Sequence, residues 1–203
     1  MKYIIATKKN MTQLFDESGR VYPATVLSYG PLTIIQKKTK AIDGYDAVQL
    51  GFGSKSVNQL SKAVLSHSGI AADAKKGFAL LKEVQGLFGE KGETIPFDFA
   101  SGDVVTVSGT TKSKGFQGVV KRYNFKGGPG SHGQKHSERE RGSSGAGGYQ
   151  RVFKGTRMAG RMGGDKMTFK NMTIVSVDTA NNLIYVKGAV PGRRGTVVEI
   201  VQK

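Results

Sequence analysis

The sequence predicts a mainly β protein, a small barrel or sandwich with one or two short helices and a long basic, glycine-rich insertion. Short apolar runs recur every 10 to 15 residues with turn residues between them, a spacing typical of small barrels and sandwiches. Only one stretch has the period of an amphipathic helix. The 57 residues from 108 to 164 show hardly any apolar periodicity and carry most of the net charge.

The clearest strand signals lie in the first quarter of the chain. Runs rich in β-branched and aromatic residues alternate with clusters of Asp, Asn, Ser, Gly and Pro. Pro23 confines the start of the second strand to an edge or a bulge, because proline cannot donate a ladder hydrogen bond. The predicted strands are residues 3–6, 21–28, 32–37 and 45–52, with turns at 16–19, 29–31 and 43–44.

Residues 58–68 have a helical pattern. Leu60, Ala63, Val64 and His67 are spaced at i, i+3, i+4 and i+7, which predicts one buried helical face. Gly69 is expected to end the helix, and His67 is expected to be a packed core residue.

Further strands are predicted on both sides of the basic segment. Because the strand pattern resumes after it, this segment is expected to be an insertion in one β domain. The predicted body is residues 1–107 and 165–203, and the inserted arm is residues 108–164. The later predicted strands are 79–84, 95–99, 103–107, 167–177, 183–187 and 197–201, with a turn at 178–182.

The basic segment 108–164 has an unusual composition. It holds 12 Lys and Arg against two acids, Glu138 and Glu140, a net of +10 out of +16 for the whole chain. It also holds 15 of the 29 glycines. Such a segment cannot bury enough apolar surface to offset its backbone entropy, so alone in water it should stay disordered. We expect it to become ordered when it is threaded into RNA.

The cations of this segment predict contacts with RNA phosphates. Arg can grip phosphate with two hydrogen bonds or stack on a base, whereas Lys acts as a point charge. The aromatic side chains, Tyr149 included, could stack on unpaired bases. If about 8 cations contact phosphates, affinity should fall several-hundred-fold between low and physiological salt. The predicted rRNA-binding residues are Lys112, Lys114, Lys121, Arg122, Tyr123, Phe125, Lys126, His132, Lys135, His136, Arg139, Arg141, Arg151, Phe153, Lys154, Arg157 and Arg161.

Two motifs in the segment suggest other chemistry. Residues 128–133 match the dinucleotide-binding pattern Gly-x-Gly-x-x-Gly, but no buried strand precedes them and no helix follows. His132 and His136 have a spacing that suits a metal on a helix, but a third ligand and a helix are both lacking. We therefore expect neither a cofactor nor a metal ion.

Composition narrows the class of protein further. The pI is near 10.0, which indicates a polyanionic partner, nucleic acid before membrane. No apolar run approaches the roughly 20 residues that a membrane span needs. The chain has no cysteine, which fits a reducing cytosol. No nucleophile beside a base and no buried carboxylate pair stands out, so an enzyme and a small-molecule substrate are not expected.

Several long motifs resemble ribosomal protein L3 of the large subunit, in its bacterial form. They are VSGTTKSKGFQGVVKRYNFKGGPGSHG from residue 107, RVFKGTRMAGRMGG from residue 151 and NLIYVKGAVPG from residue 182. Shorter matches are KKNMTQLF at 8–15, YPATVL at 22–27 and DGYDAVQLGFG at 43–53.

The resemblance implies a β-barrel body bound to rRNA near its 3′-terminal domain, beside neighbouring large-subunit proteins of a cytoplasmic ribosome. It further implies an arm that reaches toward the peptidyl transferase centre, and an early role in subunit assembly. Residues 112–122 and 151–161 would be the two legs of the arm, and 142–149 would lie near its far end.

Three places depart from the family pattern. Asn10 stands where the family has Gly before Met-Thr, and asparagine tolerates the left-handed backbone that we expect in a turn there. Residues 137–145 lack the usual proline and isoleucine, and residues 147–150 lack the usual Thr-Pro-Gly. The far end of the arm is therefore divergent.

Two other functions are compatible with the residues. One is an enzyme, such as a flavin-binding small barrel or an RNA-modifying protein whose basic arm recruits substrate. The other is a general nucleic-acid-compacting protein, which would bind duplex DNA and structured RNA alike.

Overall fold

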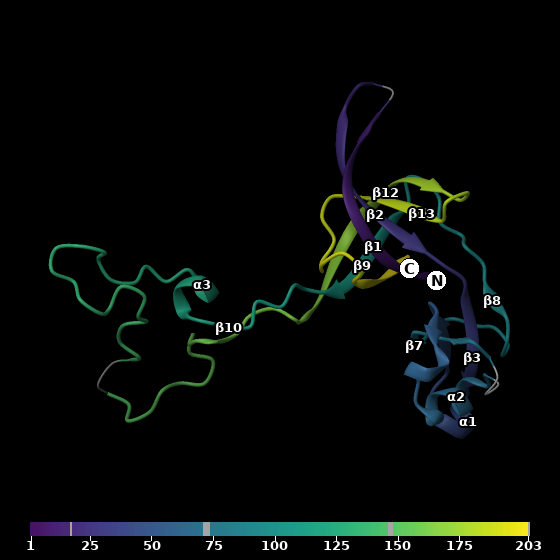
Figure 1. Ribbon diagram of the computed structural model, residues 1–203, viewed down its shortest axis with the longest axis horizontal. Coiled ribbons are helices and arrows are strands. Elements are labelled where there is room, and N and C mark those ends of the chain that lie inside the picture. The colour runs from purple at the N-terminus through teal and green to yellow at the C-terminus, as the bar shows by residue number, and fades with distance from the viewer. Residues whose placement is uncertain (17, 71–73, 146–147, 203) are drawn as a thin grey trace. The chain divides into compact units, whose positions relative to one another are not determined.

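A computed structural model describes residues 1–16, 18–70, 74–145 and 148–202. The chain forms two compact units (Figure 1). We call the first unit, Met1–Thr110 with Lys166–Lys203, the body, and the second, Thr111–Asp165, the arm.

The body contains a closed six-stranded β-barrel, which confirms the mainly β fold with a barrel. Its strand order is β1-β14-β9-β12-β13-β2, and every neighbouring pair is antiparallel. Closure leaves no unpaired edge within the ring. The strands are β1 (Lys2–Phe15), β2 (Val21–Tyr29), β9 (Val104–Thr110), β12 (Lys166–Asp178), β13 (Leu183–Lys187) and β14 (Val197–Gln202).

Alternation along the strands fills the barrel interior. In β9, Val105, Val107 and Gly109 are buried while their neighbours are more exposed. Ile184 of β13 and Ile200 of β14 are fully buried as well. Branched apolar side chains of this kind pack well on the inner face of a small barrel and exclude water from it.

A second sheet shares the hydrophobic core with the barrel. Its order is β7-β4-β3-β8, and Leu32, Leu50 and Val84 from this sheet belong to one buried cluster with barrel residues. The strands are β3 (Leu32–Lys38), β4 (Ala47–Phe52), β7 (Leu80–Val84) and β8 (Thr94–Ile95), and the small pair β5 (Lys55–Ser56) and β6 (Lys76–Gly77) lies outside both sheets. The helices of the body are α1 (Lys40–Asp43), η1 (Val57–Gln59) and α2 (Lys62–Ser68).

The helix α2 is shorter than predicted, and none of its residues is fully buried, so the predicted buried face is not formed. The Ser61 side chain accepts a hydrogen bond from the Val64 amide at 3.3 Å and so caps the helix, and Gly69 ends it at φ 65°, as predicted. The prediction that His67 is a packed core residue was wrong: His67 is exposed and its Nε2 lies against Gln49 Oε1.

Side chains on either side of the helix, together with Leu65 within it, pack over a glycine. A Cβ on Gly77 would lie 2.6 Å from Leu60 Cδ1 and 3.0 Å from Ile70 Cδ1. The side chains of Leu60, which belongs to the predicted face, and of Ile70, which does not, therefore fill the space above Gly77, whereas His67 lies against Gln49.

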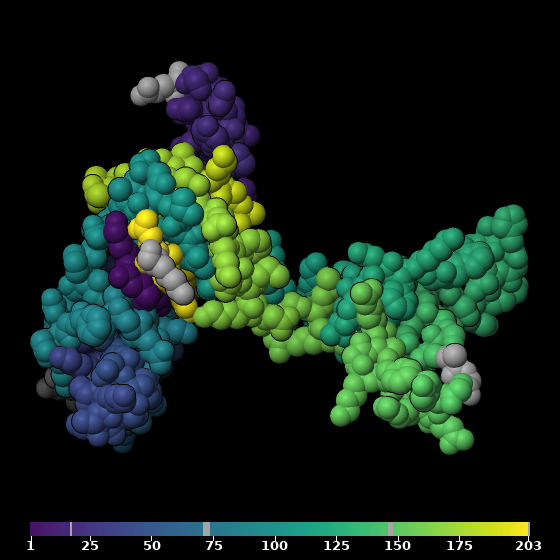
Figure 2. All heavy atoms as spheres, turned by 180° about the vertical axis from the view of Figure 1, so that it is seen from behind, coloured from purple at the N-terminus to yellow at the C-terminus, as the bar shows by residue number. Residues whose placement is uncertain are grey.

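The first strand continues far beyond the predicted end at residue 6. β1 and β2 form a hairpin that extends past the barrel and stands clear of it in the space-filling view (Figure 2). Its outer part keeps strand geometry through the ladder between the two strands, so polar side chains are tolerated on it. Pro23 lies in this part, paired with Gln13 of β1, just beyond the ladder between β2 and β13, which fits the predicted edge position.

Two further features, the backbone at Asn10 and the end of β8, differ from the sequence prediction. The turn expected at Asn10 is a β-bulge, with the register of β1 shifting between Lys8 and Met11, and Asn10 has no left-handed backbone. β8 ends at Ile95 rather than continuing to residue 99, because Pro96 follows and cannot donate to the ladder.

Candidate nucleic-acid interface

The two ends of the arm run side by side at its root (Figure 1). The short strands β10 (Phe116–Gln117) and β11 (Gly160–Arg161) pair antiparallel. The Lys114 amide donates to the Met162 carbonyl at 2.9 Å, and the Met162 amide donates to the Gly115 carbonyl at 2.9 Å. We call residues 111–123 and 157–165 the root of the arm. The sequence did not predict any of its strands or its helix.

Glycines allow the root to close. Gly163 has φ 75°, and a Cβ there would overlap the Lys112 carbonyl oxygen on the opposite leg. A Cβ on Gly160 would lie 2.7 Å from Arg122 Nη1. Gly163 requires the absence of a side chain, because the two legs approach there at backbone distance, and Gly160 leaves room for the Arg122 guanidinium.

The short helix α3 (Val119–Tyr123) connects the legs. Val119 is buried, and Arg122 Nη1 donates to the Met158 carbonyl at 2.8 Å. The guanidinium carbons of Arg122 and Arg157 lie 5.0 and 5.7 Å from the centre of the Tyr123 ring. The cation–π contact of Arg157 therefore joins α3 to the returning leg, while that of Arg122 lies within the helix.

The loop beyond α3 approaches a later segment of the arm. The Gly128 amide donates to the Glu138 carbonyl at 3.1 Å, and a Cβ on Gly127 would overlap the same carbonyl. Lys126 and Arg141 line a hollow of about 440 Å³ at this crossing. In the described residues 124–145 no helix follows residue 133 and no strand precedes residue 128, and His132 has a left-handed φ of 57°. A dinucleotide-binding site needs a strand directly before the glycine motif and a helix directly after it, and this part of the described chain provides neither.

Aromatic rings also gather on the returning leg. The rings of Tyr149 and Phe153 meet edge to face with centroids 5.1 Å apart, and the Arg151 guanidinium lies 5.3 Å from the Phe153 ring. Both rings are more than half exposed. Exposed rings with an adjacent guanidinium suit stacking on unpaired bases. Residues 146 and 147, in the expected far end, lie outside the described residues.

Most of the predicted site residues are exposed, and the described part of the arm contains no ion pair that engages its cations. Four are half-buried: Arg122, Tyr123, Phe125 and Arg141. Arg122 and Arg141 also donate within the protein, Arg141 to Ser144 Oγ at 2.6 Å. The exposed ones are Lys112, Lys114, Lys121, Lys126, His132, Lys135, His136, Arg139, Arg151, Phe153, Lys154, Arg157 and Arg161.

The structural use of Arg122 was not apparent from the sequence. Its contact at the Met158 carbonyl lies 36 residues further along the chain, close to its other neighbour, Gly160. The glycines of the run Met-Ala-Gly-Arg-Met-Gly-Gly at residues 158–164 were the available signal for a close approach of two backbones.

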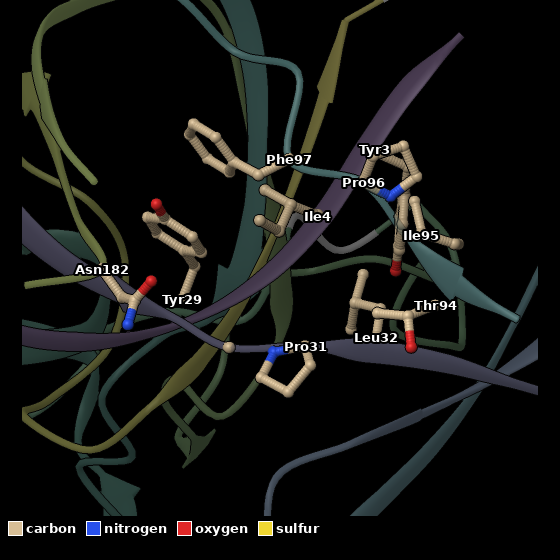
Figure 3. Close-up of a pocket in the computed structure, with 11 residues that line it drawn as sticks. Tyr3, Ile4, Tyr29, Pro31, Leu32, Thr94, Ile95, Pro96, Phe97 and Asn182 are labelled. Atoms are coloured by element: carbon tan, nitrogen blue, oxygen red, sulfur yellow. The ribbon is translucent and has the colours of Figure 1, made fainter. Parts of the chain in front are cut away.

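A hollow in the body has different chemistry. It has a volume of about 330 Å³ and is lined by apolar and neutral side chains, with the Tyr29 and Phe97 rings stacked at 4.2 Å (Figure 3). The Tyr3 hydroxyl is buried and has no hydrogen-bond partner among the described residues, and burial together with the charge of Glu199 raises its pKa. No charged side chain lines this hollow, so it does not suit phosphate.

The described residues contain no group of three or more His, Cys, Asp or Glu side chains that could hold a metal ion. In the same part of the chain, no helix has the length and apolar character needed to cross a membrane.

Comparison with known proteins identifies the family. The family model for ribosomal protein L3 matches residues 87–182, which include the whole arm. Large ribosomal subunit proteins uL3 of Bacillus thuringiensis (strain Al Hakam), Bacillus cereus (strain B4264) and Bacillus anthracis (strain CDC 684 / NRRL 3495) are each 44% identical over 203 residues. Each match covers 98% of this chain and 95% of the relative. The chain therefore belongs to the ribosomal protein L3 family, whose members are structural proteins of the large ribosomal subunit.

Proposed function

We propose that this protein is a structural constituent of the large ribosomal subunit that binds rRNA directly through the arm. It helps nucleate subunit assembly, packs beside neighbouring large-subunit proteins, and extends the arm toward the peptidyl transferase centre. It performs no reaction of its own, because peptide-bond chemistry would belong to the RNA. The supporting observation is the dense set of exposed arm cations that no carboxylate of the described arm neutralises.

Charge and backbone together favour RNA as the partner. Twelve cations within 57 residues repel each other unless a dense anion neutralises them, and the phosphates of a folded RNA provide regularly spaced charge. The glycines allow the backbone to approach closely, and exposed rings such as Phe153 can stack on bases. A membrane surface would not use backbone approach or base stacking.

In this proposal the root also fixes the position of the two legs relative to each other. The root holds residues 116–117 and 160–161 together through protein hydrogen bonds, so the legs enter the RNA from one fixed point. The loops between the legs then neutralise phosphates between RNA helices and hold those helices in place.

Binding selectivity tests the proposal against a general compacting protein. The affinities of the full chain for large-subunit rRNA, for an unrelated structured RNA of equal length and for duplex DNA are compared by filter binding at matched salt. We expect a preference for the rRNA of at least about 10³-fold, the lower end for specific nucleic-acid complexes. Equal affinities for all three would contradict the proposal and favour compaction.

A further inference from the structure

The body carries a basic hollow that is separate from the arm. It lies where the bulge of β1 meets the turn that precedes β14 and has a volume of about 510 Å³. Its lining contains no apolar side chain and no acid: Thr7, Lys8, Lys9, Asn10, Arg194 and Gly195. The predicted rRNA-binding residues all lie within 108–164, and the resemblance implied that the body also binds rRNA without indicating which of its residues do so.

Lys8 fixes the turn that forms one wall of this hollow. Its Nζ donates to the carbonyl oxygens of Val190 at 2.6 Å and Gly192 at 3.1 Å. The Lys8 backbone adds two bonds, donating to the Thr196 carbonyl at 2.9 Å and accepting from the Gly195 amide at 2.8 Å. The turn is thus held to β1 at four points, and its backbone is ordered before any ligand arrives.

The same construction directs two cations into solvent. The register shift in β1 places Lys9 and Asn10 opposite a single residue of β2, and such a bulge redirects side chains. Lys9 is exposed on this bulge, and Arg194 is exposed on the fixed turn, next to exposed Arg193. A lysine point charge and an arginine fork therefore border one hollow from two rigid elements.

Charges in the rest of the body do not neutralise these cations. The described residues contain no carboxylate within ion-pair distance of Lys9, Arg193 or Arg194. The six ion pairs of the described body engage Lys2, Lys37, Lys38, Lys82 and Lys166 instead. Protein interfaces have a fully buried core that is depleted of charged residues and rich in apolar ones, which this hollow lacks. Its composition suits a phosphodiester backbone.

We infer that Lys9 and Arg194 form a second RNA-binding site, on the barrel, that takes phosphates of the rRNA backbone while Lys8 positions the turn. This site rests on the proposed function, since it deepens how the same protein holds the same RNA. Phosphate contacts fix orientation rather than read sequence. The body would then set the direction in which the RNA is presented to the arm.

A charge-matched pair of variants tests the site in the full-length chain. The double variant Lys9→Ala/Arg194→Ala removes both cations, and Lys62→Ala/Lys91→Ala removes two exposed lysines elsewhere in the body. Affinity for in vitro transcribed Bacillus large-subunit rRNA is measured over a series of KCl concentrations. The first variant should lower the slope of log K against log[KCl] by about 1.5 to 2 and weaken binding roughly tenfold or more at 0.15 M. The control should retain the wild-type slope.

Several outcomes would overturn this assignment. One is a slope for Lys9→Ala/Arg194→Ala that equals that of the control variant. Another is unchanged rRNA binding with loss of binding to polyglutamate, which would assign the hollow to an acidic protein segment. Thermal melts monitored by circular dichroism should give both variants the wild-type midpoint, because all four side chains are exposed. Absence of any rRNA preference in the wild-type chain would instead contradict the proposed function, a result separable from the comparison of variants.

Discussion

Single glycines determine whether the root of the arm can close. Gly163 combines a left-handed backbone with direct contact against the Lys112 carbonyl, so a methyl group there meets two penalties at once. Arg122 also helps to hold the two legs together. Its guanidinium occupies the space above Gly160 and donates to the Met158 carbonyl. Arg122, which the sequence analysis predicted to bind RNA phosphate, therefore contacts the protein's own backbone.

The substitution Gly163→Ala should open the root. Strain of about 1 to 3 kcal/mol is expected for a non-glycine residue held at such a backbone position, in addition to the steric overlap. The amides of Lys114 and Met162, which bond across the root, should lose protection against hydrogen exchange. The affinity of the variant for large-subunit rRNA should also be lower than that of the wild type.

Gly130→Ala is the matched control for that change. Gly130 lies in the same arm, has no left-handed φ and has open space where a Cβ would be placed. Its exchange and binding should equal those of the wild type. Unchanged protection of Met162 in Gly163→Ala would show that the legs do not need to approach this closely.

At the scale of elements, the turn between β12 and β13 makes the stability of the barrel sensitive to acid. The Asp178 carboxylate accepts from the Asn181 side chain at 2.8 Å and from the Asn181 amide at 3.1 Å, and these bonds hold its pKa below the usual range. A lowered folded-state pKa stabilises the protein above the unfolded value of about 3.9, and that contribution disappears as the pH falls below it.

The expected result is a lower urea midpoint at pH 3 than at pH 6 for the wild type, with a smaller difference for Asp178→Ala. Part of the dependence should survive in the variant, because the bond from the Ala100 amide also lowers the pKa of Asp103. Urea unfolding followed by circular dichroism over this pH range measures it. An identical pH dependence in both proteins would mean that the turn contributes no acid sensitivity.

Elements were predictable from the sequence where alternation and turn chemistry coincide. Residues 167–177, 183–187 and 197–201 match β12, β13 and β14 within one residue at each end. Prediction failed where a partner strand, rather than burial, maintains the element, as in the outer half of β1. It failed again in the root, where β10, β11 and α3 depend on glycine contacts between residues far apart in the sequence.

For the candidate interface, the sequence indicated the segment but not the contacts within it. Net charge and glycine content identified the segment that belongs to one compact unit, and most of its cations are exposed. The sequence could not separate Arg122, which contacts protein, from exposed cations such as Lys121. It also gave no reason to select Lys9 and Arg194, because their common hollow depends on a bulge and a distant turn.

At the scale of the whole molecule, we expect the body to fold without the loops of the arm. The barrel closes through β9 and β12, which pair directly with each other, so removal of residues 127–148 leaves every barrel ladder in place. The deletion variant should have a thermal midpoint close to that of the wild type and should assemble into large subunits poorly. An unfolded variant would contradict the interpretation of the arm as an insertion.

The most direct measurement of the central claim is co-sedimentation of the tagged protein with large ribosomal subunits through a high-salt gradient. The full-length chain should migrate with the large subunit, and the chain lacking residues 127–148 should remain largely at the top of the gradient. Free migration of the full-length chain, or equal retention of both chains, would contradict an arm that holds this protein in ribosomal RNA.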